Sequence, residues 1–400
     1  MDPRTRLPVV GMVGAGQLAR MTHQAAVALG QSLRVLAVSP DDPAAMVSPD
    51  VVLGRPDDAD ALPRFLAGCD VVTFDHELVP MEPLASLAAA AAGGVPLRPA
   101  PHALAHAQDK MVMRDRLTAL GVPCPPYRAV ASVADVEAFG AEHGWPVVLK
   151  ARSGGYDGRG VWMLDDLAEA ERVVAETLAA GTSLMVEQKV RMRRELAALV
   201  ARSPFGQGAA WPVVESVQEN GICVEVIAPA PGLSQDRAEA AQSLALRVAN
   251  ELDVVGLLAV ELFEVDGPGS GLLVNELAMR PHNSGHWTIE GSRTSQFEQH
   301  LRAVLDYPLG STSLTAPVTV MANVLGGDPA PDMSMDERAH HLFARFPDVK
   351  VHLYGKGERP GRKIGHVTAL GDEVEPTRRR AVTAAAWLST AQWLSSDKWT

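Results

Sequence analysis

The feature that most constrains this chain is the glycine-rich octapeptide SGGYDGRG at positions 153–160. It lies between two short apolar runs, 146–149 and 161–164, so the pattern predicts a loop that joins two strands. Four glycines leave backbone N–H groups open to a phosphate, and Lys150 and Arg159 add positive charge. A Walker-type loop would instead begin a helix and end in Gly-Lys-Ser/Thr. The octapeptide therefore predicts a mobile flap over ATP, and an ordinary exposed hairpin is the alternative.

Composition limits the function classes without choosing one. The 400 residues exceed what a single core usually organises, so we expect two or three domains. A net charge of −12 and the lack of a basic stripe argue against nucleic-acid binding. Cys69, Cys124 and Cys223 are scattered and have no metal-ligand spacing, which indicates reduced, buried thiols. Without a signal-like segment or an apolar run of membrane length, we expect a cytoplasmic protein that contacts no membrane.

The first part of the chain alternates strand-like and helix-like segments, which predicts a doubly wound parallel sheet. We expect strands at 8–13, 33–38, 70–74 and near 95–97, and helices at 17–29 and 82–92.

A proline-rich segment at 121–126 indicates a linker, because proline cannot continue a helix. After it we expect a strand at 127–130, helices at 132–143 and 166–179, and long strands that form an antiparallel sheet. The C-terminal part is short and mixed, with a terminal helix beginning near Arg378. The overall prediction is an α/β and α+β protein with three domains, at 1–118, 119–320 and 321–400, in which the flap spans 151–160.

The turn Gly14–Ala19, GAGQLA, lies between the first strand and the first helix. It is similar to a dinucleotide fingerprint with alanine in the third glycine position, but no acidic residue ends the second strand to bind a ribose. We therefore expect Gln17 and Leu18 to contact a substrate, and tight turn geometry is the equal alternative. The segment 73–77, TFDHE, ends another strand and either faces the same crevice or has a structural role.

Two glutamates face each other in a predicted hairpin. Apolar strands around Glu261 and Glu276 flank a glycine-rich turn at 266–271. If Val265 pairs with Leu272, Glu261 stands directly opposite Glu276, with Cβ atoms about 5 Å apart. Opposed like charges are destabilising unless a cation lies between them, and Mg²⁺ takes one or two carboxylates plus substrate phosphates. The pair predicts a magnesium site, with two solvated carboxylates as the alternative.

Two further loops carry anion-binding residue types. The segment 278–287, AMRPHNSGHW, contains Arg280, whose guanidinium can hold a carboxylate or bicarbonate through two hydrogen bonds. The segment 354–366, YGKGERPGRKIGH, combines glycines with basic residues and predicts a second phosphate site. A plain surface turn is the alternative there.

Taken together, SGGYDGRG after Lys150, VEQ at 186–188, NELA at 275–278, HNSGHW at 282–287 and RPGRKIGH at 359–366 resemble an ATP-grasp enzyme. Within that superfamily the chain is similar to the N5-carboxyaminoimidazole ribonucleotide synthetase family of purine biosynthesis. The resemblance runs along nearly the whole chain in the same order. It implies that ATP phosphorylates bicarbonate and that the resulting carboxyphosphate carboxylates 5-aminoimidazole ribonucleotide, in a homodimer that needs Mg²⁺.

The resemblance also implies residue roles. Glu261 and Glu276 bind Mg²⁺; the segment 187–190 offers backbone groups to adenine, and Glu195 accepts from the ribose. The full set implied for the nucleotide is Lys110, Lys150, Ser153, Gly154, Gly155, Tyr156, Gly158, Arg159, Gly160, Glu187, Gln188, Lys189, Val190, Glu195, Gln218, Asn275 and Glu276. The residues implied in catalysis on bicarbonate and carboxyphosphate are Arg280, His282, Asn283 and Asp157. The residues implied for the ribonucleotide are Gln17, Leu18, Tyr156, Asp157, Arg280, Lys356, Arg362 and Lys363.

The chain departs from the family pattern at a few positions. Lys110 and Arg114 stand where the family often has Arg and then Lys, and Gln218 stands where His is frequent. Asp75 and His76 replace a more Glu-rich strand end.

Three alternatives stay open at this point. Another ATP-grasp ligase, such as a formate-dependent glycinamide ribonucleotide transformylase or a biotin carboxylase, would share the flap and the glutamate pair, although not HNSGHW with RPGRKIGH. A dinucleotide-binding oxidoreductase would bind NAD without Mg²⁺. A catalytically silent binding protein would not need the full set of charged residues.

Overall fold

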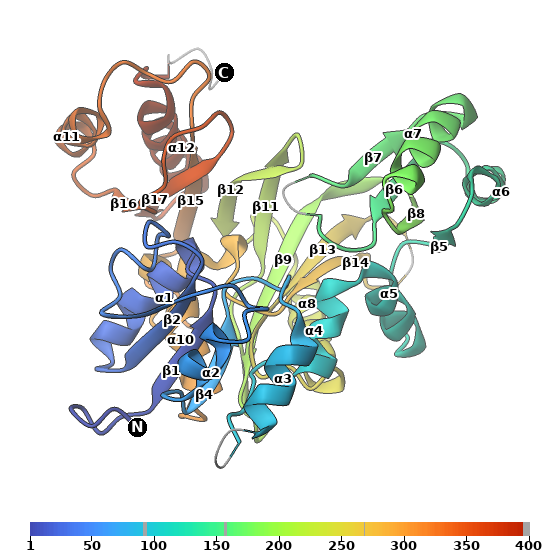
Figure 1. The fold of residues 1–400 in the computed structure, drawn as a ribbon. Helices are drawn as coiled ribbons and strands as arrows, with labels where there is room; N and C mark the ends of the chain where they lie inside the picture. Colours follow the sequence, from blue (N-terminus) through green and yellow to red (C-terminus); the bar gives the residue numbers. More distant parts are fainter. Residues whose placement is uncertain (91–93, 156–157, 268, 395–400) are drawn as a thin grey trace.

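The computed structural model describes residues 1–90, 94–155, 158–267 and 269–394 (Figure 1). Its strands form three sheets, of four, nine and four strands. In Figure 1 the first sheet lies with the N-terminus, the largest sheet runs through the middle, and the third projects to one side with its two helices.

The N-terminal sheet is parallel, as predicted, with the strand order β3-β2-β1-β4. The strands β1 and β4 are buried over their whole length, which explains why their sequences do not alternate between apolar and polar residues. Its strands are β1 (Val9–Val13), β2 (Ser32–Ala37), β3 (Asp50–Leu53) and β4 (Val71–Phe74). The accompanying helices are α1 (Gln17–Ala28), α2 (Ala61–Leu66) and α3 (Met81–Ala90).

One predicted strand is wrong and several elements escaped prediction. Leu97 makes only an isolated bridge to Val72, because the neighbouring Pro96 has no N–H to extend a ladder. The short strand β3 and helix α2 have too few periodic residues to be recognised. Two further helices, α4 (Pro101–Gln108) and α5 (Lys110–Ala119), precede the linker, and Asp109 caps α5 by accepting from Met111 N and Val112 N.

The small antiparallel sheet carries the flap and has the order β5-β8-β6-β7. Apolar residues of its two helices pack on the sheet around Leu149 and Val186. The strands are β5 (Tyr127–Val130), β6 (Val147–Ala151), β7 (Val161–Leu164) and β8 (Leu184–Gln188), and the helices are α6 (Val133–His143) and α7 (Leu167–Ala179). The predicted strand–flap–strand is confirmed, because β6 pairs antiparallel with β7 and Lys150 is opposite Val161.

The large sheet is antiparallel and has the order β14-β13-β9-β11-β12-β15-β17-β16, with β10 paired to β9. Position 320, where the predicted second domain ends, lies inside β15. Its strands are β9 (Met192–Arg202), β10 (Gly208–Ala210), β11 (Val214–Glu219), β12 (Ile222–Ala228), β13 (Gly256–Val265), β14 (Leu272–Ala278), β15 (Val318–Leu325), β16 (Lys350–Leu353) and β17 (Lys363–Gly371). Its helices are α8 (Gln235–Glu251), the 3-10 turn η1 (Asn283–Gly285), α9 (Thr288–Gly291), α10 (Gln296–Val304), α11 (Met335–Arg345) and α12 (Val374–Thr390), which begins four residues before the predicted start.

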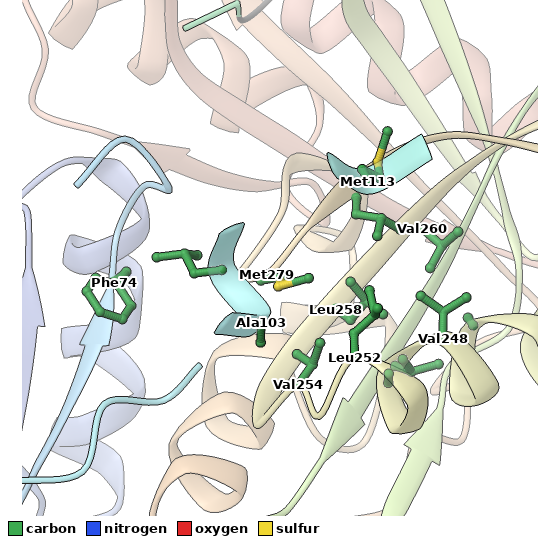
Figure 2. Close-up of a cluster of buried hydrophobic side chains, with 14 of the residues drawn as sticks. Phe74, Ala103, Met113, Val248, Leu252, Val254, Leu258, Val260 and Met279 are labelled. Atoms are coloured by element: carbon green, nitrogen blue, oxygen red, sulfur yellow. The ribbon is translucent and has the colours of Figure 1, made fainter. Parts of the chain in front are cut away.

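A continuous apolar core joins the first sheet to the large one. Figure 2 shows Phe74 from β4, Met113 from α5 and Met279 just after β14 in the same cluster, which extends to Val248 on α8. This packing fixes the end of β14, and with it the loop that follows, against the N-terminal sheet. Over the residues that the structure describes, no helix is both long and apolar enough to span a membrane.

Candidate active site

A buried charged cluster lies at the base of the flap. Lys150 on β6 has its Nζ 2.6 Å from Glu187 Oε2 on β8, and it donates to Asn275 Oδ1 on β14 at 3.2 Å. Arg114 on α5 donates from Nε to Glu187 Oε1 at 2.6 Å. Burial alone would raise the pKa of Glu187, but the charges of Lys150 and Arg114 outweigh it and lower that pKa to about 2. The glutamate is therefore ionised, and it holds Lys150 beside β14.

Glu261 and Glu276 face each other across β13 and β14, as predicted, but the register near the turn differs from the prediction. Val265 does not pair with Leu272, since Glu264 takes that place. A bulge at Asn275 then shifts the pairing by one residue and brings the two glutamates opposite each other.

Each glutamate of the acidic pair contacts a nitrogen atom of a neighbouring side chain. Glu261 Oε1 lies 3.2 Å from His282 Nε2, and Glu276 accepts from Lys110 Nζ. Burial would raise the pKa of Glu261, yet the hydrogen bond from His282 outweighs it and the pKa is lowered. Burial and the charge of Glu261 raise the pKa of the adjacent Glu195, on β9, to about 7. Among the described residues, no group of three or more His, Cys, Asp or Glu side chains is arranged to hold a metal ion. The pair Glu261 and Glu276 alone offers two carboxylates, and Mg²⁺ can be bound by one or two carboxylates together with substrate phosphates and water.

The flap approaches the large sheet. At Gly158 φ is +76°, and an added Cβ would lie 3.3 Å from Asn220 O and 3.4 Å from Gly221 Cα in the β11–β12 turn. The flap is anchored at its base, where Ala151 N donates to Gly160 O at 2.8 Å. Also within the described part are Ser153, Gly154, Gly155 and Arg159. Tyr156 and Asp157, predicted to contact the ribonucleotide, lie outside the described residues.

The other predicted nucleotide residues border the same region. Gln188 ends β8, and its N–H donates to the carbonyl of Pro126 in the linker, so it is not available to a ligand. Lys189 and Val190 follow β8 and lie outside the sheet. Glu195 is paired with Ser216 in the sheet, and Gln218 Nε2 donates to Ser216 Oγ at 2.9 Å.

The loop after β14 places the predicted anion-binding residues next to the acidic pair. Arg280 Nε donates to Glu77 Oε2 at 2.6 Å; burial would lower the pKa of Arg280, but Glu77 raises it. His282 Nδ1 lies 2.8 Å from Ser284 Oγ. Both amide atoms of Asn283 are buried and have no hydrogen-bond partner among the described residues. The loop thus brings together the guanidinium of Arg280, the imidazole of His282 and the amide of Asn283, which are groups that can bind a small anion. The sequence pattern marks Glu77 only as part of the polar segment 73–77 and does not predict its contact with Arg280.

The C-terminal basic loop meets the first strand–helix turn. Lys356 Nζ donates to Gln17 Oε1, which brings together two predicted substrate residues 339 positions apart. Arg362 donates to Gly357 O at 3.2 Å, and Lys363 begins β17.

Two residues near this turn have structural roles. The Asp75 carboxylate accepts from Gly16 N and, at 2.9 Å, from Ala19 N, so it fixes the turn. The Leu18 side chain is buried with Phe297, so only its backbone is left for a substrate.

Sequence reasoning missed a buried histidine stack behind these loops. His366 stacks on His286 at 4.9 Å and on His352 at 4.6 Å between ring centroids, and Tyr354 OH lies 2.8 Å from His366 Nδ1. Burial lowers the pKa of His286 and His366 well below the ordinary value, so both are neutral. The second histidine of HNSGHW, His286, and the histidine that ends RPGRKIGH, His366, were the available signal. The stack joins the loop after β14, through His286, to β16 and β17, through His352 and His366.

Comparisons with family models match the whole arrangement. The ribonucleotide synthetase preATP-grasp domain matches residues 7–108, the ATP-grasp domain matches 115–297, and the phosphoribosylaminoimidazole carboxylase C-terminal domain matches 319–380.

Relatives and solved structures agree along nearly the full length. The chain is 62% identical over 393 residues to the N5-carboxyaminoimidazole ribonucleotide synthase of Mycobacterium tuberculosis, covering 98% of this chain and 90% of that one. It is 37% identical to the synthetase structure from Thermus thermophilus, with a TM-score of 0.82 and coverage of 97% and 100%. The Aspergillus clavatus synthase, solved with ADP and 5-aminoimidazole ribonucleotide, is 30% identical, with a TM-score of 0.85 and coverage of 96% and 98%.

Proposed function

The chain belongs to the N5-carboxyaminoimidazole ribonucleotide synthase family of ATP-grasp enzymes, and from this we propose how its residues divide the reaction. It is an ATP-grasp ligase of purine biosynthesis that carboxylates 5-aminoimidazole ribonucleotide with the use of ATP. The observation that best supports this division of roles is the contact between the acidic pair, Glu261 and Glu276, and the loop at 278–287. Glu261 contacts His282 directly, so a transferred phosphoryl group and a bound anion would be neighbours.

Bicarbonate supplies the carbon in this proposal. One bicarbonate oxygen attacks the γ-phosphorus of ATP, the bond to the β-phosphate oxygen breaks, and ADP leaves. The exocyclic amine then attacks the carboxyl carbon of carboxyphosphate, phosphate leaves, and the amine releases a proton. Phosphoryl transfer depends mainly on positioning and charge, so no protein nucleophile is required.

The nucleotide lies between the flap and β14. Lys150 and Lys110 neutralise the phosphates, and the flap amides of Gly154, Gly155 and Gly158 close over them. Glu195 accepts from the ribose. Glu261 and Glu276 would hold Mg²⁺, which would supply charge neutralisation for the phosphates. The closed flap excludes water, which would otherwise hydrolyse carboxyphosphate.

In this proposal, bicarbonate and the ribonucleotide are bound by loops outside the ATP site. Arg280, His282 and Asn283 hold bicarbonate and then the carboxylate of carboxyphosphate. The buried amide of Asn283 has polar atoms to spare for this contact. Lys356 and Arg362, assisted by Lys363 and Gln17, bind the ribonucleotide 5′-phosphate, and we assign Tyr156 and Asp157 to its aminoimidazole. A homodimer is the expected assembly, which sedimentation velocity checks.

ADP release tests the proposal. It is measured in ATP, Mg²⁺ and bicarbonate, with and without 5-aminoimidazole ribonucleotide, and then with glycinamide ribonucleotide and formate. The proposal expects a large rise only with the aminoimidazole acceptor, matched by bicarbonate-derived carbon on its amine. Release only with glycinamide ribonucleotide and formate would keep the ATP site and overturn the acceptor.

A further inference from the structure

Arg114 is a fully buried cation to which neither the family pattern nor the sequence assigns a task. Its side chain is 1% exposed, and burying an arginine is costly unless every donor finds a partner. The guanidinium donates to Glu187 Oε1 at 2.6 Å, to Val274 O at 3.0 Å and to Asn275 O at 2.8 Å. One side chain thus joins α5, β8 and two successive carbonyls of β14.

Those two carbonyls belong to the bulge. Successive carbonyls of a regular strand point to opposite edges, so one guanidinium can receive both only where the strand is irregular. Val274 lies on the outer edge of β14, where its N–H also donates to Pro123 O in the linker at 2.8 Å. The carbonyl of Asn275 would point toward β13 in a regular strand, and Arg114 holds it outward instead.

The bulge decides which side chain faces Glu261. Beyond the turn, Glu264 pairs with Leu272 and Leu262 with Val274; continued without interruption, this register would place Asn275 opposite Glu261. The extra residue replaces Asn275 by Glu276, and it leaves Asn275 Oδ1 to accept from Lys150. With Glu264 paired to Leu272 beside the turn, the carboxylate pair therefore depends on the bulge.

We propose that Arg114 is a positioning residue of the nucleotide–metal site, which holds the bulge so that Glu276 meets Glu261 and Asn275 meets Lys150. The inference rests on the proposed function of this pair as the Mg²⁺ site. Residues that orient metal ligands commonly alter metal affinity by about 10- to 100-fold when they are replaced.

The test is calorimetric binding of ADP in Mg²⁺ and in EDTA, which needs no turnover. Arg114→Lys keeps the charge but cannot reach Glu187 and both carbonyls with a planar fork. We expect its ADP affinity in Mg²⁺ to fall by about 10- to 100-fold, while its affinity in EDTA stays within about 3-fold of wild type. Arg378→Lys is the matched control, because it also breaks a two-hydrogen-bond pair with a buried glutamate, Glu225, far from the site.

A second pair of variants covers the case in which Arg114→Lys does not fold. Glu187→Gln leaves the hydrogen bonds from Arg114 to the two carbonyls in place. Arg114→Lys/Glu187→Gln removes these hydrogen bonds, and it leaves no unpaired carboxylate at position 187. The proposal expects the Mg²⁺-dependent loss only in the double variant. Equal Mg²⁺ dependence in both members of the pair, or an equal loss in Arg378→Lys, would overturn it. Wild-type protein that binds ADP equally in Mg²⁺ and EDTA would instead refute the metal site itself.

Discussion

Glu187 is ionised although it is buried, because Lys150 and Arg114 are bonded to its two oxygens. Its pKa falls from an ordinary 4.5 to about 2, so its stabilising effect is complete above pH 4.5 and is lost as the pH falls toward 2. We expect Glu187→Gln to be about 3 kcal/mol less stable than wild type at pH 7. Urea unfolding from pH 7 to pH 3 should show this gap narrowing below about pH 5, and a constant gap would contradict the ion pairs.

Glu276 makes a different kind of contribution, because we propose that it binds Mg²⁺ and that its partner Lys110 binds the ATP phosphates. We expect Glu276→Gln to fold normally but to release ADP at least about 100-fold more slowly. The reason is that Mg²⁺ would lose one of its two carboxylate ligands, so the charge of the transferred phosphoryl group would be less well neutralised. Steady-state rates over a Mg²⁺ series measure this. The control is Glu251→Gln at the exposed end of α8. A wild-type rate at saturating Mg²⁺ would remove Glu276 from the metal site.

At the scale of elements, the flap is tested by two glycines that both have a positive φ. Gly158 has φ +76° and approaches the β11–β12 turn, whereas Gly144 has φ +83° and open space around an added Cβ. Alanine at either position has to adopt a positive φ, which is strained for a residue with a Cβ. Only Gly158→Ala should raise the ratio of ADP released to ribonucleotide carboxylated, because an imperfectly closed flap admits water. Equal ratios in the two variants would contradict closure against that turn.

Elements were predictable where one physical pattern dominates. The apolar runs around the flap predicted β6 and β7, and alternating elements predicted the parallel N-terminal sheet. The hairpin of Glu261 and Glu276 was found, but its bulge was not, because a bulge depends on a partner distant in sequence, here Arg114. The facing glutamates were thus predicted correctly from an incorrect register.

At the scale of the whole molecule, the ribonucleotide site that we propose combines residues from both ends of the chain. Lys356 from the C-terminal loop contacts Gln17 at the first strand–helix turn. We expect Lys356→Ala to raise KM for 5-aminoimidazole ribonucleotide by about 10-fold or more, through the lost phosphate charge, with KM for ATP unchanged. Lys350→Ala, on the exposed start of β16, is the control. A parallel rise in both KM values would place Lys356 elsewhere than at the acceptor phosphate.

Long-range contacts also explain what the sequence could not predict about the site. Short motifs placed Arg280, His282 and Lys356 correctly in loops, since their residue types and spacing are local properties. The partners Glu77 and Arg114 and the histidine stack of His366 arise only when separate parts of the chain pack together.

The measurement that tests the account most directly follows oxygen from ¹⁸O-labelled bicarbonate during turnover with ATP and 5-aminoimidazole ribonucleotide. If bicarbonate attacks the γ-phosphorus beside the acidic pair, each phosphate released contains one oxygen from bicarbonate, in step with carboxylated product. Phosphate without the label, released while the ribonucleotide is carboxylated, would contradict the transfer of the phosphoryl group to bicarbonate.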